Sequence, residues 1–423
     1  MSRRRALALL ALALLCTMYL ARIGGFVLQD PDEGRYAEIP REMLETGDWV
    51  TPRLFYVKYF EKPPLLYWLT ALSFRAFGLT EWAARLVPAL SGIVTVVLTF
   101  FLGARLAGTR AAWIGAGVLT TMPLFFALSQ ALLIDMLLTA CMTATMLGVA
   151  AAHVADDKRG WALLVAFTAA LGVLAKGLVA LALPGAIALA FLLATRDFAT
   201  IRALLGWPAV LLFLVVAVPW FVVVSLRNPE FFEFFFVREH LQRFLASAPG
   251  KVGHREGPFY YVPVMLLGPA PWTLVAGVLA ATAAGRRAFL AIPREVRLLL
   301  LLWAGIVVGF FTLSTSKLAT YVLPALPPLA ILAGAWIDRA LEEHALSQRV
   351  IGVLRGMLLG LGGTLALLAL VAWPLYERIA GWTHSEASDV LLIAGVVSWT
   401  ALALLAAGVA SHLLRLERRG RPA

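Results

Sequence analysis

Long apolar runs recur along almost the whole length of this chain. Of its 423 residues, 61% are hydrophobic and only 14% are charged, and the mean hydropathy is +0.85. A transmembrane helix needs roughly 20 mainly apolar residues, and no soluble globular domain has this many such runs. They predict an all-α polytopic membrane protein with about twelve transmembrane helices, near residues 6–28, 83–104, 111–129, 132–153, 161–175, 177–195, 203–225, 258–284, 297–314, 318–337, 350–374 and 390–414.

Basic residues indicate which ends of these helices face the cytoplasm. Arginine and lysine are concentrated in every second connection, from Arg3, Arg4 and Arg5 to the tail between Arg415 and Arg421. Cytoplasmic loops carry such an excess, so both termini are expected in the cytoplasm. The same sorting explains the net charge of +11 without a nucleic-acid partner. The chain is read as a single membrane domain over residues 1–423, with its two longest outward connections at 29–82 and 226–257.

The outward connection 29–82 begins with the most polar stretch of the chain. Residues 29–64 carry acids and bases of both signs among aromatic residues and prolines. Charges beside a membrane are costly unless they are solvated or paired, and they commonly mark a substrate pathway or an active site. A solvated loop whose acids and bases pair with one another is the simpler alternative. The aromatic residues and prolines favour a shaped surface, and therefore a functional site.

Ionisable residues also lie at the outer ends of later helices. Asp135 begins the fourth predicted helix, Lys176 separates two apolar runs, and Lys317 lies in STSKLATYVLP. Each alone is compatible with a structural ion pair, but their convergence on one membrane face favours a shared site. Carboxylates with several cations suit the transfer of a group away from a phosphate, because cations stabilise charge that grows on the leaving group. A carboxylate can orient or deprotonate the attacking hydroxyl. The sequence has no GxxxxGK[ST] motif, so ATP-driven transport is unsupported.

Two segments of the outward connections are amphipathic. Residues 65–78 and 230–245 carry aromatic residues on one helical face, which predicts helices that lie in the membrane interface. Re-entrant packing segments are the alternative. The phenylalanines between positions 231 and 236 are interpreted as an interfacial anchor rather than as a surface on which a sugar stacks.

The first outer loop resembles that of a known family. Residues 30–54, DPDEGRYAEIPREMLETGDWVTPRL, and 59–68, YFEKPPLLYW, look like the first outer loop of polyprenyl-phosphate-sugar-dependent glycosyltransferases of the C-type fold. Within that group the chain is most similar to the bacterial lipid A aminoarabinose transferases, which are relatives of the protein O-mannosyltransferases. The similarity covers nearly the whole chain and continues in LLIDMLLTA, AKG, FFFVREHLQRF, GPFYYVPVMLLGPAPW and STSKLATYVLPALPPLA.

The resemblance implies roles for individual residues. The family's essential aspartate in the first loop falls on Asp32, and a second important aspartate falls on Asp135. These two are expected to be catalytic. Lys62 and Arg243 are expected near the lipid phosphate, and Lys317 near the donor cavity. The full set of residues expected to bind substrate is Glu33, Arg35, Tyr36, Glu61, Lys62, Lys176, His240, Arg243, Lys317 and Tyr321.

The resemblance also implies a reaction and a location. It implies inverting transfer of aminoarabinose, or of another hexose or pentose, from undecaprenyl phosphate to lipid A, another glycolipid, a glycan or a protein. The expected location is the periplasmic face of a bacterial inner membrane, among membrane lipids. No cofactor is required, although in relatives a metal sits near the residues that match Glu61 and His240. The fuller relatives carry a soluble outer domain toward the C terminus. This chain is expected to lack it, so the acceptor stays open.

Two other function classes are compatible with a polytopic membrane protein. A flippase or transporter of a lipid-linked sugar would carry ionisable residues near the bilayer midplane and paired broken helices, whereas here these residues lie at the outer ends. A structural subunit of an envelope complex would not need them at all. The transferase is the favoured hypothesis, with Asp32 as the base or orienting group for the acceptor.

Overall fold

The computed structural model describes residues 3–21, 23–29, 31–242 and 256–342, with a few backbone positions between 352 and 367. In these ranges, six helices are long and apolar enough to cross a membrane, or eight if two bent helix pairs each count as one span. This confirms a polytopic helical protein. The predicted helices 350–374 and 390–414 lie almost wholly outside the described residues, so the number twelve stays a prediction. The six long spans are α4 (Glu81–Ala107), α7 (Ile134–Val154), α8 (Arg159–Lys176), α11 (Trp207–Arg227), α17 (Arg294–Leu313) and η2 (Ala319–Ala325) continued by α18 (Leu326–Glu342).

Two predicted spans are broken by prolines. The expected helix 111–129 is α5 (Thr109–Thr120) followed by α6 (Pro123–Ser129), bent by 66°. The expected helix 258–284 is α14 (Tyr261–Leu267) followed by α15 (Trp272–Ala281), bent by 91°. A proline disfavours the helical conformation of the residue before it, and hydropathy alone does not register this effect.

Shorter helices complete the described part of the chain. The first, α1 (Arg3–Leu20), ends well before the predicted residue 28, and α9 (Val179–Ala194) is shorter than a standard span. The connecting helices are α10 (Phe198–Leu204), α12 (Glu230–Phe232), the π-helix η1 (Glu233–Gln242) and α16 (Ala283–Ala291).

The most buried span is α7, which packs between α4 and α8. Its threonine hydroxyls donate hydrogen bonds to backbone carbonyl oxygens one turn earlier, as Thr139 does to the Asp135 carbonyl at 2.7 Å. This satisfies polar groups inside the membrane region. A Cβ atom at Gly148 would stand 2.7 Å from Cγ2 of Val165, so a glycine is required for this close approach to α8. In contrast, α11 is mostly exposed.

The polar stretch folds into α2 (Asp32–Thr46), a hairpin of β1 (Arg53–Leu54) and β2 (Val57–Lys58), and α3 (Leu65–Phe77). The hairpin corrects the all-α prediction in a small way. Its turn residues Phe55 and Tyr56 both have positive φ, 53° and 60°, as a two-residue turn of this kind demands. The backbone N–H of Tyr56 donates to Glu42 Oε2 at 2.9 Å and its hydroxyl donates to Glu45 Oε2 at 2.9 Å, which holds the turn against α2.

The helix predicted at 65–78 is confirmed as α3, while its place in a membrane interface stays a prediction. The phenylalanines of the second connection do not form one exposed anchor. Phe231 and Phe235 are buried, and Phe232 is 60% exposed. Phe231 packs edge-on to Phe60 and Trp220, with ring centroids 5.2 and 5.4 Å apart. Aromatic packing between the two outer connections therefore replaces the expected contact with lipid for these buried rings.

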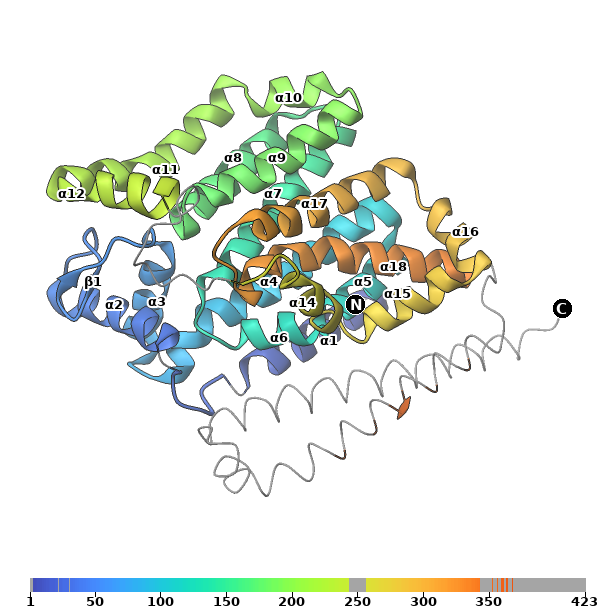
Figure 1. The fold of residues 1–423 in the computed structure, drawn as a ribbon, viewed down its shortest axis with the longest axis horizontal. Coiled ribbons are helices and arrows are strands. Elements are labelled where there is room, and N and C mark those ends of the chain that lie inside the picture. The colour runs from blue at the N-terminus through green and yellow to red at the C-terminus, as the bar shows by residue number, and fades with distance from the viewer. Residues whose placement is uncertain are drawn as a thin grey trace.

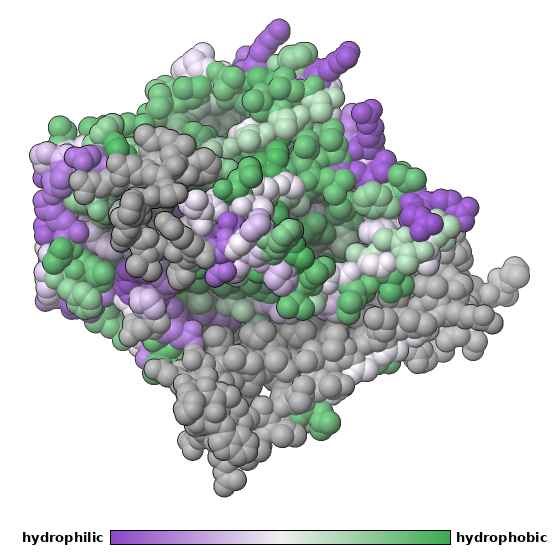
Figure 2. Space-filling view, in the orientation of Figure 1, coloured by the Kyte–Doolittle hydropathy of each residue, from purple (hydrophilic) through white to green (hydrophobic). Residues whose placement is uncertain are grey.

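The polar elements gather at one end of the helix bundle. In Figure 1, α2, α3, β1 and α12 lie together at the left, α16 lies at the right, and α10 lies at the top. On the face shown in Figure 2, hydrophilic residues lie along the left-hand edge and along the upper and right-hand edges, with a smaller group near the middle, and apolar residues cover most of the remaining coloured area. This distribution is that of a protein whose middle faces lipid and whose two ends face water.

Candidate active site

Arg35 joins the acidic residues of the first outer loop. It lies one turn after Asp32 on α2 and makes an ion pair with the Asp32 carboxylate. Its guanidinium also donates a hydrogen bond to the Tyr59 hydroxyl at 3.2 Å and lies 3.9 Å from Glu61 Oε2. Asp32 and Glu61 thus share one cation, while the Asp32 side chain stays 52% exposed.

Residues 59–64, YFEKPP, hold Glu61 beside this arginine. The Tyr59 hydroxyl donates to Glu61 Oε2 at 2.9 Å, and Lys62 Nζ donates to the Glu61 carbonyl oxygen at 3.2 Å. Phe60, between Tyr59 and Glu61, is buried. Because its ring packs on Phe231, the second outer connection anchors the Glu61–Lys62 pair.

Tyr36 lies on α2, in the first outer loop. It is buried and stacks on Tyr67, with ring centroids 6.1 Å apart. Burial first, and then the neighbouring Tyr59 and Asp135, raise the pKa of the Tyr36 hydroxyl well above its usual value. The hydroxyl therefore keeps its proton. Tyr36 belongs to the same packed core as Leu132 and Ile134, the residues just before Asp135.

Asp135 has an ion-pair partner that is distant in sequence. It lies on the first turn of α7 and pairs with Lys176 at the end of α8, with side chains 8% and 10% exposed. The Lys176 ammonium also lies 4.6 Å from the centre of the Tyr321 ring, which is a cation–π contact. Three residues that the sequence placed in separate segments therefore meet in one cluster.

Lys317 lies just before η2, the element that carries Tyr321. Its Nζ donates to the carbonyl oxygens of Ser314 at 2.6 Å and Glu256 at 3.3 Å. The residue is 5% exposed, and none of the ion pairs formed among the described side chains involves it. Neutral carbonyls satisfy its N–H groups without cancelling its charge, so Lys317 adds positive potential at this site.

The remaining expected residues lie at the limit of the described chain. His240 is in η1, and Arg243 lies outside the described residues. In the part of the chain that the structure describes, no three His, Cys, Asp or Glu side chains are grouped so that they could hold a metal ion. Glu61 faces the Arg35 guanidinium and the Tyr59 hydroxyl, two donors that compete with a cation for its carboxylate. The predicted metal stays a prediction, and no step below depends on it.

Glu33, which was expected to bind substrate, forms a buried ion pair with α4. Its carboxylate is 5% exposed and pairs with Arg85 on α4 at 2.8 and 2.7 Å. Protein donors bond to both carboxylate oxygens, and the contact with substrate expected for Glu33 stays a prediction. Sequence reasoning missed Arg85, because a single arginine near the start of an apolar run has no distinctive pattern. Its position in a membrane helix was the signal available.

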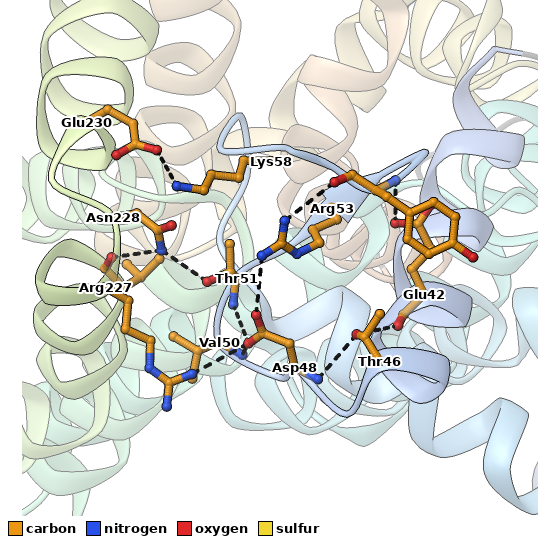
Figure 3. A network of polar contacts seen from close by, with 12 residues as sticks. Glu42, Thr46, Asp48, Val50, Thr51, Arg53, Lys58, Arg227, Asn228 and Glu230 are labelled. Atoms are coloured by element: carbon orange, nitrogen blue, oxygen red, sulfur yellow. Dashed lines mark hydrogen bonds and ion pairs between the residues drawn. The ribbon is translucent and has the colours of Figure 1, made fainter.

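A polar network fastens the two outer connections together (Figure 3). Asn228, which is 3% exposed, donates to Thr51 Oγ1 at 3.0 Å. The indole N–H of Trp220 donates to the Val50 carbonyl oxygen at 3.0 Å. Two ion pairs complete the network, Asp48–Arg227 at 3.6 Å and Lys58–Glu230 at 2.6 Å. The loop that carries Glu61 and Lys62 is therefore held against the end of α11 and against α12.

Sequence comparisons agree with this geometry. The family described as dolichyl-phosphate-mannose-protein mannosyltransferase matches residues 4–235. An undecaprenyl phosphate-alpha-4-amino-4-deoxy-L-arabinose arabinosyl transferase of Edwardsiella ictaluri is 32% identical over 406 residues, which cover 95% of this chain and 71% of the relative.

Solved structures show the same relationship in the fold. The crystal structure of ArnT from Cupriavidus metallidurans bound to undecaprenyl phosphate has a TM-score of 0.76 and 31% identity, and the match covers 96% of this chain and 77% of ArnT. The archaeal oligosaccharyltransferase AglB from Archaeoglobus fulgidus shares the fold alone, with a TM-score of 0.50 and 15% identity over 96% of this chain and 56% of AglB. Since sequence, fold and the clustering of acids and bases agree, the chain belongs to the dolichyl-phosphate-mannose-protein mannosyltransferase family and is a membrane glycosyltransferase of the C-type fold.

Proposed function

We propose that this glycosyltransferase moves a sugar, aminoarabinose or another hexose or pentose, from undecaprenyl phosphate to an acceptor with inversion at the sugar carbon. The names of the relatives support the donor. The acceptor is lipid A, another glycolipid, a glycan or a protein. The observation that carries the proposal is a pair of acid–base clusters, Asp32–Arg35–Glu61 and Asp135–Lys176–Tyr321. The sequence neighbours of the two clusters, Tyr36, Ile134 and Ala175, belong to one packed core.

The lipid phosphate is assigned to the cations near the second connection. Lys317 is buried and its N–H groups are bonded to neutral carbonyls, so its charge is available to stabilise the phosphate as the sugar departs. Lys62, and Arg243 from the sequence analysis, are proposed to act with it. Arg35 already pairs with Asp32 and donates a hydrogen bond to Tyr59, so its proposed role is to position these groups.

The acceptor is assigned to Asp32. Its side chain is half exposed, and Arg35 holds it in one direction. If the acceptor is a hydroxyl, Asp32 takes its proton as the hydroxyl oxygen attacks the sugar carbon opposite the phosphate. If the acceptor is itself a phosphate, its oxygen already carries the charge and Asp32 orients it. Asp135, which Lys176 neutralises, is proposed to organise this end of the bundle.

The proposed location is the periplasmic side of a bacterial inner membrane. The alternation of basic residues along the chain supports cytoplasmic termini. It places the end of the bundle that carries α2 and α12 outside, where an acceptor from the outer leaflet can reach Asp32.

The test follows the fate of the donor. Purified protein in detergent is mixed with candidate undecaprenyl-phosphate sugars and an outer-membrane lipid extract, and release of undecaprenyl phosphate is measured by mass spectrometry. Release is expected for the wild type and strongly reduced for Asp32→Asn and Lys317→Met. Lys58→Ala, which removes an exposed cation of the same loop, is the matched control. Full activity of Asp32→Asn would refute its assigned role.

The same experiment separates a transferase from a flippase. A flippase would leave the sugar–phosphate bond of every donor intact, whereas the transferase releases the free lipid phosphate. The mass gained by the extract identifies the acceptor.

A further inference from the structure

Arg85 is fully buried near the start of α4 and uses every donor that it has. Nε and Nη2 donate to the two Glu33 oxygens at 2.8 and 2.7 Å. Nη1 donates to the carbonyl oxygens of Ile23 and Phe26 at 2.9 and 2.7 Å, and Nη2 also donates to that of Val27 at 2.8 Å. A guanidinium has five N–H groups, and these five contacts occupy them. No donor of Arg85 is left for a substrate.

Three of the five contacts reach a segment that has no helical structure of its own. Residues 23–29 connect α1 to α2 without helix or strand. The Phe26 ring also lies 4.0 Å from the Arg85 guanidinium carbon. Because Arg85 bonds both to this segment and to Glu33 on the first turn of α2, it links the chain on the two sides of the helix start.

Glu33 extends the same contacts to the second acid–base cluster. Its Oε1 accepts from the backbone N–H of Leu132 at 2.7 Å, and its Oε2 accepts from the backbone N–H of Gln29 at 3.0 Å. Leu132 lies three residues before Asp135, just ahead of α7. The Glu33 carboxylate therefore bonds to backbone N–H groups three residues before each aspartate, at Gln29 and Leu132.

We propose that Arg85 and Glu33 are positioning residues for glycosyl transfer, which together set the distance between the Asp32 and Asp135 clusters. This inference rests on the proposed function. Neither residue has a donor or acceptor free for substrate, so both act through the backbone that they hold. The buried pair resists displacement because both charges lie out of water and each satisfies the other. Geometry that is fixed before the reaction affects the rate, since a misplacement of catalytic groups by about 1 Å can lower the rate about 100-fold.

The consequence is a loss of rate without a loss of donor binding. The Glu33→Asp variant keeps the charge but shortens the side chain by one methylene, so the ion pair or the bond to Leu132 must move. We expect kcat to fall about 100-fold, while KM for the donor and binding of undecaprenyl phosphate stay within about threefold of wild type, because Lys62 and Lys317 are untouched. Arg85→Lys and Glu33→Gln are expected to lower kcat in the same way.

The control variant removes a half-exposed ion pair at the other end of the bundle, in which the arginine side chain is 53% exposed. Arg110, next to the C-terminal end of α4, is 2.9 Å from the Asp338 carboxylate on α18. Asp338→Asn is expected to leave kcat unchanged when activity is expressed per folded molecule. Thermal unfolding of each purified variant gives the folded fraction.

The outcomes are distinct. A folded Glu33→Asp variant with wild-type kcat would overturn the inference, and so would failure of all three variants to fold, because the pair would then be a folding requirement rather than a positioning device. Absence of donor turnover by the wild type would instead contradict the proposed function itself.

Discussion

At the scale of single residues, the two aspartates of the candidate site differ in how far their side chains are buried. The Asp32 side chain is 52% exposed beside Arg35, whereas the Asp135 side chain is 8% exposed beside Lys176. An exposed ion pair contributes about 0–1 kcal/mol to stability. In a buried pair, loss of one partner leaves the other charge uncompensated. The two residues should therefore respond differently to the same substitution.

Asp135→Asn is expected to destabilise the protein by about 3–5 kcal/mol, because the charge of Lys176 stays buried without its partner. Adding Lys176→Met should recover much of this loss, since the double variant buries no charge. Thermal unfolding in detergent measures both. Asp32→Asn, the exposed counterpart, should change stability by no more than about 1 kcal/mol. Equal melting temperatures for the single and double variants at Asp135 and Lys176 would contradict the argument.

The hairpin turn gives a second prediction for a single residue. Phe55 has a φ of 53° and is 73% exposed, so its side chain adds little packing to compensate for an unfavourable backbone conformation. Asparagine adopts this conformation more readily, and Phe55→Asn should stabilise the protein by about 1 kcal/mol. Val57→Asn is the control, because Val57 is similarly exposed but lies in β2. A lower melting temperature for Phe55→Asn would show that the ring has a partner.

At the scale of elements, the two outer connections contact one another beside the candidate site. The residues of this contact differ in burial. Asn228 is 3% exposed, while the side chains of Lys58 and Glu230 are 40% and 52% exposed. The Lys58 contact holds the pKa of Glu230 below its usual value, but solvent screens an ion pair at such a site. Buried hydrogen bonds and aromatic packing therefore hold the first loop in place.

Asn228→Ala is expected to loosen residues 48–58, because the bond to Thr51 is lost in a buried place at a cost of about 1–3 kcal/mol. Backbone hydrogen exchange of Val50 and Thr51 should become faster. Lys58→Ala should have a smaller effect, below about 1 kcal/mol. Faster exchange in Lys58→Ala than in Asn228→Ala would show that the exposed ion pair dominates.

At the scale of the whole molecule, α7 connects the candidate site at one end of the helix bundle to a loop at the other end. Asp135 begins this helix, and the loop at residues 155–158 follows it. The positive residues Lys158 and Arg159 in and after that loop predict a cytoplasmic location. The hairpin of β1 and β2 then lies on the opposite side, together with Asp32.

Cysteine labelling tests this orientation. A thiol reagent that cannot cross membranes should label Phe55→Cys in cells whose inner membrane is intact. It should label Asp156→Cys only after that membrane is permeabilised. The native thiols give a low background, because Cys141 is buried and Cys16 is partly buried. Labelling of Asp156→Cys alone in intact cells would reverse the proposed orientation.

Much of the site was predictable because motifs and hydropathy are local properties. The DEGRYAE and YFEKPP segments named Asp32, Arg35, Glu61 and Lys62, and the structure brings these four residues together around Arg35 and Glu61. Tyr59 and Arg85 were missed. Tyr59 is significant only through its bonds to Arg35 and Glu61, and Arg85 only through its bonds to Glu33 and the 23–27 segment.

The sequence by itself determined that this is a polytopic helical membrane protein and that acids and bases gather on one side of it. A run of about 20 apolar residues is favourable in the hydrocarbon core of a bilayer, and this preference can be read from the residues of the run alone. Only the tertiary structure decided that Lys176 and Tyr321 serve Asp135 and that Glu33 turns inward to Arg85. Such pairs depend on which helix ends approach one another, and close packing at small residues such as Gly148 sets that approach.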